Sequence, residues 1–145
     1  MSDATPRVFI SYSQADWAEV AEIKEMLKEL EVRYVSDAEI SAGEDGGEAV
    51  QAALDNSDVF IACLSPSYLS SEWLNYELGT AIGRAADART KLVPLLLQAT
   101  TSPRILNQFH PIRADGETRA ELQGHLGRAL GVGRVEQSAP AMVAG

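Results

Sequence analysis

The chain has 145 residues, of which 46% are hydrophobic and 23% are charged, so we expect one globular domain with a substantial apolar core. Its formal net charge of −9 argues against nucleic acid and anionic membranes as partners, because phosphate groups are bound mainly by Lys and Arg. The single cysteine, Cys63, cannot form an intrachain disulfide, and no Cys/His cluster or membrane-length apolar run occurs. These features predict a cytoplasmic protein without a metal.

Five short apolar segments, separated by amphipathic or alanine-rich stretches, predict β-strands. They are residues 7–11 (RVFIS), 32–36 (VRYVS), 58–64 (DVFIACL), 91–97 (KLVPLLL) and, more weakly, 109–113 (FHPIR). This alternation is typical of βαβ units around a parallel sheet. Pro94 cannot donate to a strand ladder, so we expect the fourth strand near a sheet edge or bulged at that residue.

Helical patterns fill the intervals between the strands. The first helix is indicated by apolar residues at helical spacing and by a capping box formed by Asp16 and Glu19. Its predicted apolar stripe is Val20, Ile23, Leu27 and Leu30. A short helix is expected over 48–55, after the glycine-rich loop 43–47, and another from Ser70 or Ser71 to about Ala86. The predicted buried stripe of that helix is Leu74, Leu78, Ala81, Ile82 and Ala85.

The last helix is predicted over 117–130, and small and polar residues follow it. The predicted organisation is an N-terminal extension (1–6), one domain (7–130) and a disordered tail or linker (131–145). Five strands of this kind favour a flavodoxin-like, doubly wound α/β fold with strand order 2-1-3-4-5 and helices on both faces of the sheet. The topological switch then lies between strands one and three. We therefore expect a ligand crevice between the loops SYSQAD and SPSYLSSEW.

Four segments carry a family resemblance. FISYSQAD (9–16), SDAEISAGED (36–45), DVFIACLSPSYLSSEW (58–73) and WLNYELGTA (73–81) together resemble a TIR domain of the bacterial type, over about residues 7–130. Enzymatic TIR domains cleave NAD⁺ and carry a Trp-x-x-x-Glu pattern, matched here by Trp73 and Glu77. The resemblance implies that Glu77 is the catalytic glutamate and that Trp73 is the aromatic residue beside it.

The resemblance also implies the remaining substrate-binding residues. Phe9, Ser11 and Tyr12 match the floor of the family's pocket. The segment 37–47 matches a loop that closes over the substrate and makes domain–domain contacts, which places Asp37, Ile40 and Gly43 at the substrate. Residues 43–47 lack a basic side chain that many members carry there, so recognition of the pyrophosphate is left unexplained.

The chemistry is consistent with one carboxylate. Glu77 follows Trp73 by four residues, so both project from one row of a helix, and Glu77 is expected at the border of core and crevice, partly desolvated. Enzymatic hydrolysis of an ordinary glycoside requires two carboxylates. NAD⁺ is easier to cleave, because nicotinamide leaves a pyridinium cation as a neutral ring. NAD⁺ is thus the expected substrate, with no cofactor, and the product is linear or cyclic ADP-ribose.

The family resemblance further implies homotypic TIR–TIR assembly, control by a fused or separate sensor domain, and a role in bacterial immunity or virulence. The main alternative is a non-catalytic adaptor, whose acidic loop residues Glu44 and Asp45 would pair with a basic patch on another copy. A nucleoside deoxyribosyltransferase is a minor alternative. A receiver domain is excluded because strand three does not end in an aspartate. A dehydrogenase is excluded because no GxGxxG motif follows the first strand, and a flavodoxin because no phosphate-binding loop does.

Glu77 and Trp73 also have simpler interpretations. Glu77 could be a solvated surface charge, and Trp73 could be a core anchor at a helix start. Cys63 lies among apolar neighbours and is expected to be inert. His110 and His125 have no partners at metal-ligand spacing, so structural or surface roles are expected for them.

Overall fold

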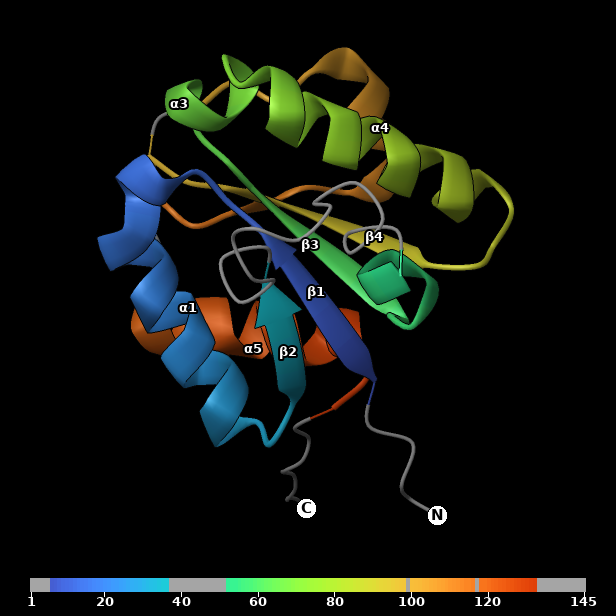
Figure 1. The fold of residues 1–145 in the computed structure, drawn as a ribbon. Coiled ribbons are helices and arrows are strands. Elements are labelled where there is room, and N and C mark those ends of the chain that lie inside the picture. The colour runs from blue at the N-terminus through green and yellow to red at the C-terminus, as the bar shows by residue number, and fades with distance from the viewer. Residues whose placement is uncertain (1–5, 37–51, 99, 117, 133–145) are drawn as a thin grey trace.

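The computed structural model describes residues 6–36, 52–98, 100–116 and 118–132. It contains a five-stranded parallel sheet with the order β2-β1-β3-β4-β5, as predicted (Figure 1). The strands are β1 (Arg7–Ser11), β2 (Arg33–Ser36), β3 (Val59–Leu64), β4 (Lys91–Leu96) and β5 (Ile112–Arg113). The flavodoxin-like fold is thereby confirmed, although the fifth strand is only two residues long.

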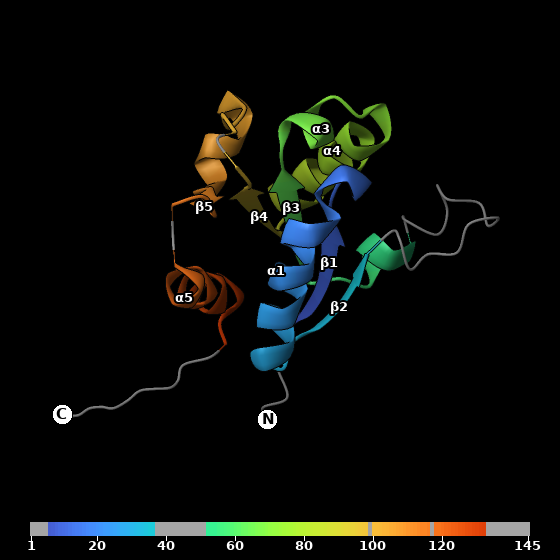
Figure 2. The ribbon, with the colours of Figure 1, turned by 90° about the vertical axis from the view of Figure 1, so that its left-hand side faces the viewer.

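Helices cover both faces of the sheet. Among the described residues, the helices besides residues 52–55 are η1 (Gln14–Asp16), α1 (Trp17–Glu29), α3 (Pro66–Leu69), α4 (Glu72–Ala86), η2 (Arg104–Phe109) and α5 (Arg119–Leu130). Of the helix predicted over 48–55, residues 52–55 are helical and the rest lies outside the described residues. α1 and α5 lie on one face and α3 and α4 on the other (Figures 1 and 2). No helix within the described residues is long and apolar enough to span a bilayer.

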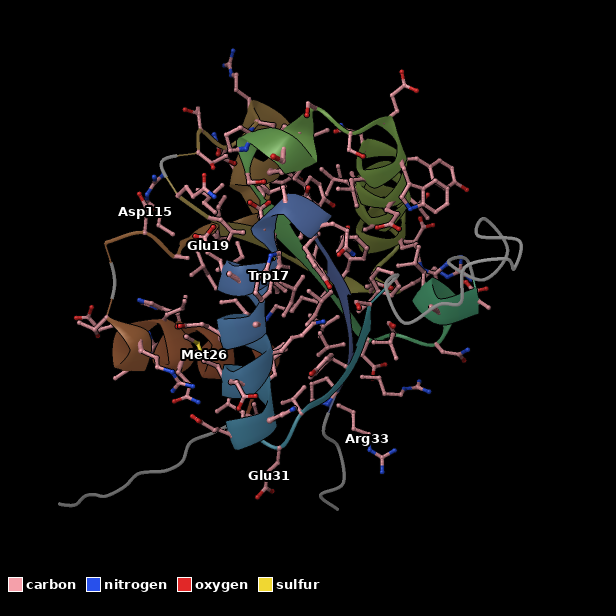
Figure 3. All side chains as sticks on the ribbon, turned by 60° about the vertical axis from the view of Figure 1, so that its left-hand side comes forward. Trp17, Glu19, Met26, Glu31, Arg33 and Asp115 are labelled. Atoms are coloured by element: carbon pink, nitrogen blue, oxygen red, sulfur yellow. The ribbon has the colours of Figure 1, made fainter. Side chains whose placement is uncertain are left out.

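The sheet separates two apolar clusters, as a parallel sheet covered on both faces requires. Val8 and Ile10 of β1 pack toward α1 and α5, and Met26 extends from α1 toward α5 (Figure 3). Phe9 belongs to the cluster under α3 and α4, where its ring stacks on that of Phe60 with centroids 5.4 Å apart. This alternation decides which β1 residues can reach a group on α4.

Pro94 lies in β4, which is second from the edge of the sheet. The register of β4 with β3 is continuous through Pro94, so there is no bulge and the near-edge alternative holds. Lys91 and Leu97 donate their backbone N–H groups to the β3 side, at 2.9 and 2.8 Å. The nitrogen of Pro94 therefore faces β5, whose pairing begins only at Leu95, and no ladder bond is lost.

A local sequence signal sets the start of α4 but not that of α1. Ser71 caps α4 by accepting the N–H of Leu74 at 3.2 Å, as predicted. The predicted capping box of Asp16 and Glu19 is wrong, because Asp16 makes no side-chain cap bond to α1. Its carboxylate accepts hydrogen bonds from Ser65, directly after β3, and from Gln98, just beyond β4. A tertiary contact thus replaces the local one.

Candidate active site at the carboxyl edge of the sheet

Glu77 lies in the second turn of α4 and is fully buried, with 0% of its surface exposed. It shares the inner face of the helix with Leu74, Leu78 and Ala81, which pack on the sheet. The interpretation of Glu77 as a solvated surface charge is therefore wrong, and the expectation of partial desolvation is too weak. A buried carboxylate is costly unless polar groups replace its water, so its hydrogen bonds define the candidate site.

Ser11, the last residue of β1, provides one of these hydrogen bonds. Its hydroxyl donates to Oε1 of Glu77 at 2.7 Å, and the same hydroxyl oxygen lies 2.8 Å from the hydroxyl of Tyr68 on α3. All three side chains are fully buried. The contact joins the segments that follow β1 and β3, which is the position of the topological switch predicted from the strand order.

Trp73 begins the same helix one turn before Glu77 and remains 40% exposed. Its ring stacks on that of Tyr76, with centroids 5.4 Å apart and an interplanar angle of 27°. Tyr76 is 48% exposed. This exposure disfavours the interpretation of Trp73 as a core anchor. The two rings form an aromatic surface at the start of α4, on the helix that carries Glu77.

The other two residues expected at the pocket floor lie on opposite faces of the sheet. Phe9 is fully buried against Phe60 and is a packing residue in this structure. Tyr12 belongs to the cluster on the α1 and α5 face, where Lys24 donates to its hydroxyl at 3.3 Å and lies 4.9 Å from the ring centroid. Successive residues of a strand point to opposite faces, so Tyr12 lies on the other side of the sheet from Ser11, whereas Phe9, two residues before Ser11, lies on the same side.

Asp37, Ile40 and Gly43 lie outside the described residues. Their predicted substrate contacts stay predictions, as do the expected disordered tail and the interactions of the acidic loop.

Sequence reasoning missed Tyr68 and the hydrogen bonds that hold its segment. Ser65 caps α3 by accepting the N–H of Tyr68 at 3.1 Å, and the Ser65 hydroxyl donates to the carboxylate of Asp16. The Ser-Pro pair at 65–66 was an available signal, since a serine before proline favours a helix start. The Asp16 contact had no such signal, because 49 residues separate it from Ser65.

The other titratable groups of the described residues form no metal-binding cluster. Within the described ranges, no cluster of three or more His, Cys, Asp or Glu side chains could hold a metal ion. Burial, followed by repulsion from Asp16, raises the pKa of the Cys63 thiol to about 12, so the thiol is protonated at neutral pH. His125 lies beside Arg128, with Nδ1 2.8 Å from the guanidinium.

The fold and this geometry define a class of protein: a flavodoxin-like α/β domain with a buried carboxylate at the topological switch of its sheet. The sequence model of the TIR domain family matches residues 8–126. The chain therefore belongs to the TIR domain family. No curated protein sequence matches it significantly.

Solved structures resemble the fold at low sequence identity. The TIR domain of the Toll-related receptor TRR-2 from Hydra magnipapillata is 19% identical, with a TM-score of 0.73 over 85% of this chain and 96% of the receptor chain. The TIR domains of the activated Roq1 resistosome, which recognises the pathogen effector XopQ, are 17% identical, with a TM-score of 0.59 over 86% of this chain and 71% of that one. The CMP N-glycosidase BcmB of Clostridium botulinum is 21% identical, with a TM-score of 0.55 over 84% of this chain and 98% of that one. At these identities the likeness establishes the fold alone.

Proposed function

We propose that this TIR domain cleaves the bond between nicotinamide and ribose in NAD⁺, with Glu77 as the catalytic carboxylate. The observation that carries the proposal is a fully buried glutamate, held by Ser11 where β1 ends. A carboxylate away from water interacts strongly with a positive charge that develops near it. Burying such a group has a cost in stability, and that cost is characteristic of functional sites.

The reaction needs one anionic group at the sugar. When the C1′–N bond breaks, its electron pair stays on the nitrogen, and the pyridinium cation becomes neutral nicotinamide, so no general acid is required. Positive charge then develops on the ribose, and Glu77 stabilises it. Water adds to C1′ and releases a proton to give ADP-ribose. If an adenine nitrogen attacks instead, the product is cyclic.

Trp73 supports the choice of a flat cationic substrate. It stands one turn from Glu77 with part of its surface exposed, and an aromatic face over a cation contributes roughly 0.5–2 kcal/mol. The nicotinamide ring of NAD⁺ is such a cation. We propose that it stacks on Trp73 while the ribose reaches the carboxylate. Asp37, Ile40 and Gly43 would close over the substrate.

Activation by assembly is part of the proposal. Glu77 is fully buried, so a substrate reaches its carboxylate only after neighbouring groups move. Homotypic association, controlled by a fused or separate sensor domain, would select the open arrangement. We place this activity in the bacterial cytoplasm, in immunity or virulence signalling, as an NAD-cleaving TIR domain of the bacterial type.

The test is release of free nicotinamide from NAD⁺ by purified protein, alone and concentrated on a clustering support. Glu77→Gln is the informative variant, because the amide oxygen can still accept the Ser11 hydrogen bond while the charge is lost. Glu72→Gln, an exposed glutamate in the first turn of the same helix, is the matched control. We expect release by the wild type and by Glu72→Gln, and none by Glu77→Gln.

CMP belongs in the same assay, because a structural neighbour is a CMP N-glycosidase and CMP also carries an N-glycosidic bond. Cleavage of CMP without cleavage of NAD⁺ would indicate that the substrates are nucleotides with a neutral base. Equal traces of product from wild type and Glu77→Gln on both substrates would support the adaptor alternative. In that case the stacked, partly exposed Trp73 and Tyr76 are the first surface to examine for contacts between copies.

A further inference from the structure

We propose that Tyr68 is a positioning residue for Glu77. It donates its hydroxyl proton to Ser11, so that a two-step chain of hydrogen bonds from α3 fixes the orientation of the carboxylate. This inference rests on the proposed function for its catalytic meaning. The chain itself can be tested without any activity.

The direction of the chain follows from counting protons. A hydroxyl has one proton to donate, and Ser11 gives its proton to Oε1 of Glu77 at 2.7 Å. The contact of 2.8 Å between the hydroxyls of Ser11 and Tyr68 still needs a donor. Tyr68 must supply it. The order is therefore Tyr68 to Ser11 to the carboxylate.

Burial makes this order matter. Tyr68, Ser11 and Glu77 are each fully buried. Hydrogen bonds in series polarise one another at low dielectric, and a charged acceptor strengthens the chain. Removal of the Tyr68 hydroxyl should therefore weaken the hydrogen bond from Ser11 to Glu77. This effect requires no direct contact between Tyr68 and Glu77.

α3 holds Tyr68 in place through contacts outside itself. A helix of four residues has no stability of its own, so its position depends on its ends. Pro66 supplies a preset backbone angle at the start of the helix, and Ser65 accepts the N–H of Tyr68. The hydroxyl of Ser65 in turn donates to the buried carboxylate of Asp16.

The carboxylate of Asp16 also accepts a hydrogen bond from the segment that follows β4. Gln98 donates its amide N–H groups to Asp16 at 3.3 Å and to Glu19 at 2.7 Å. The backbone of Gln98 is left-handed, with φ at 55°. A residue other than glycine rarely adopts this conformation, and the surrounding structure must stabilise it. The segments after β1, β3 and β4 are thus joined, and the Tyr68 hydroxyl is held at Ser11.

The kinetic test is a double-mutant cycle on nicotinamide release with Tyr68→Phe, Ser11→Ala and the double variant. Tyr68→Phe removes one hydroxyl and keeps the buried ring. We expect kcat to fall about ten-fold with KM unchanged within about two-fold, because Tyr68 orients the carboxylate and does not touch the substrate. The double variant should lose no more than Ser11→Ala alone, because Tyr68 acts through Ser11.

The matched control is Tyr34→Phe, a partly buried tyrosine of β2 that lies on the opposite face of the sheet beside Lys24. It should leave kcat unchanged. Independent losses that multiply in the double variant, or an equal loss in Tyr34→Phe, would overturn the proposal. So would a Tyr68→Phe variant with wild-type kcat.

A second measurement needs no substrate. In protein labelled with ¹³C at tyrosine Cζ, the hydroxyl proton of Tyr68 can be identified by NMR. Glu77→Gln should move this proton upfield, because the charge at the end of the chain is lost, whereas Glu72→Gln should leave it in place. An unmoved resonance in Glu77→Gln overturns the chain. A moved resonance in a protein that cleaves neither NAD⁺ nor CMP keeps the chain and refutes only the proposed function.

Discussion

Two glutamates on opposite faces of the sheet, Glu29 and Glu77, differ in burial and in their hydrogen-bond partners. Glu29, at the end of α1, keeps 52% of its side chain exposed and makes paired hydrogen bonds of 3.1 Å with Arg119 of α5. The hydrogen bonds from Arg119 lower its pKa. Glu77 of α4 is fully buried and receives a hydroxyl hydrogen bond from Ser11. Glu29 links two helices, whereas Glu77 is buried at the carboxyl edge of the sheet beside the end of β1.

The difference lies in what replaces water around each carboxylate. An exposed ion pair is screened by solvent and contributes little to stability. A buried carboxylate has lost its water, so its orientation depends on fixed protein dipoles such as the Ser11 hydroxyl. We therefore expect substitutions at Glu77 to affect activity and substitutions at Glu29 to affect only the helix contact.

The largest effect expected is on catalysis. Glu77→Gln should reduce nicotinamide release by at least about a hundred-fold, while Glu29→Gln should stay within two-fold of the wild type. The reason is that only the buried carboxylate faces the reacting sugar in the proposed reaction. Rates measured at equal protein concentration on the same clustering support decide this. Equal losses in both variants would remove the functional distinction between the two faces.

The reactivity of the Cys63 thiol tests whether dissolved reagents reach the core between the sheet and the helices α1 and α5. Burial raises the pKa of its thiol to about 12, against an ordinary value of 9.0. At pH 8 the thiolate fraction is then about three orders of magnitude below that of the unfolded chain, so a thiol reagent should label the native protein far more slowly than the protein in urea. Fast labelling of native protein would show that this face opens.

The same shift has a consequence for stability. A thiol whose pKa is higher in the folded protein favours the folded state fully below pH 9, and that contribution is lost as the pH rises toward 12. The urea midpoint of the wild type relative to that of Cys63→Ala should therefore be constant below pH 9 and fall as the pH rises above 9.

Asp16 is the second buried carboxylate at the carboxyl edge. Asp16→Ala removes the acceptor for Ser65 and Gln98 and leaves the buried Ser65 hydroxyl without it, which should lower the free energy of unfolding by about 1–3 kcal/mol. Glu22→Ala, an exposed residue of α1, is the control and should be neutral. Urea denaturation measures both. A neutral Asp16→Ala would mean that the contact with Ser65 does not hold α3 in place.

The smallest effect is expected at the exposed ion pair. The folded pKa of Glu29 is lowered, so the contribution of the pair is present above pH 4.5, the ordinary value for this group, and is lost as the pH falls through the lowered pKa. The difference in urea midpoint between wild type and Arg119→Gln should be small at pH 7 and vanish in strong acid or high salt. A difference that persists at both would indicate lost packing rather than lost charge.

Local patterns in the sequence were sufficient for the order of the strands and for the long helices α1, α4 and α5, but they missed the short helices α3 and η2. Continuous apolar runs such as residues 59–64 mark strands buried on both faces, and serines before helices mark their starts. The family motif also singled out Glu77 and Ser11, which the structure brings together. The motif also includes Tyr12, whose side chain lies on the opposite face because strand side chains alternate, and Phe9, which lies on the Ser11 face and stacks on Phe60. Their substrate contacts stay predictions.

The sequence by itself determined what depends on neighbours a few residues apart: the positions of the strands and the long helices, the parallel sheet and the edge where its loops meet. Only the tertiary structure decided what depends on distant partners. Asp16 could cap its own helix or bind Ser65, and Glu77 could face water or Ser11. Each choice is settled by which segments pack together, because a polar side chain takes the partner that compensates best for the water lost on burial.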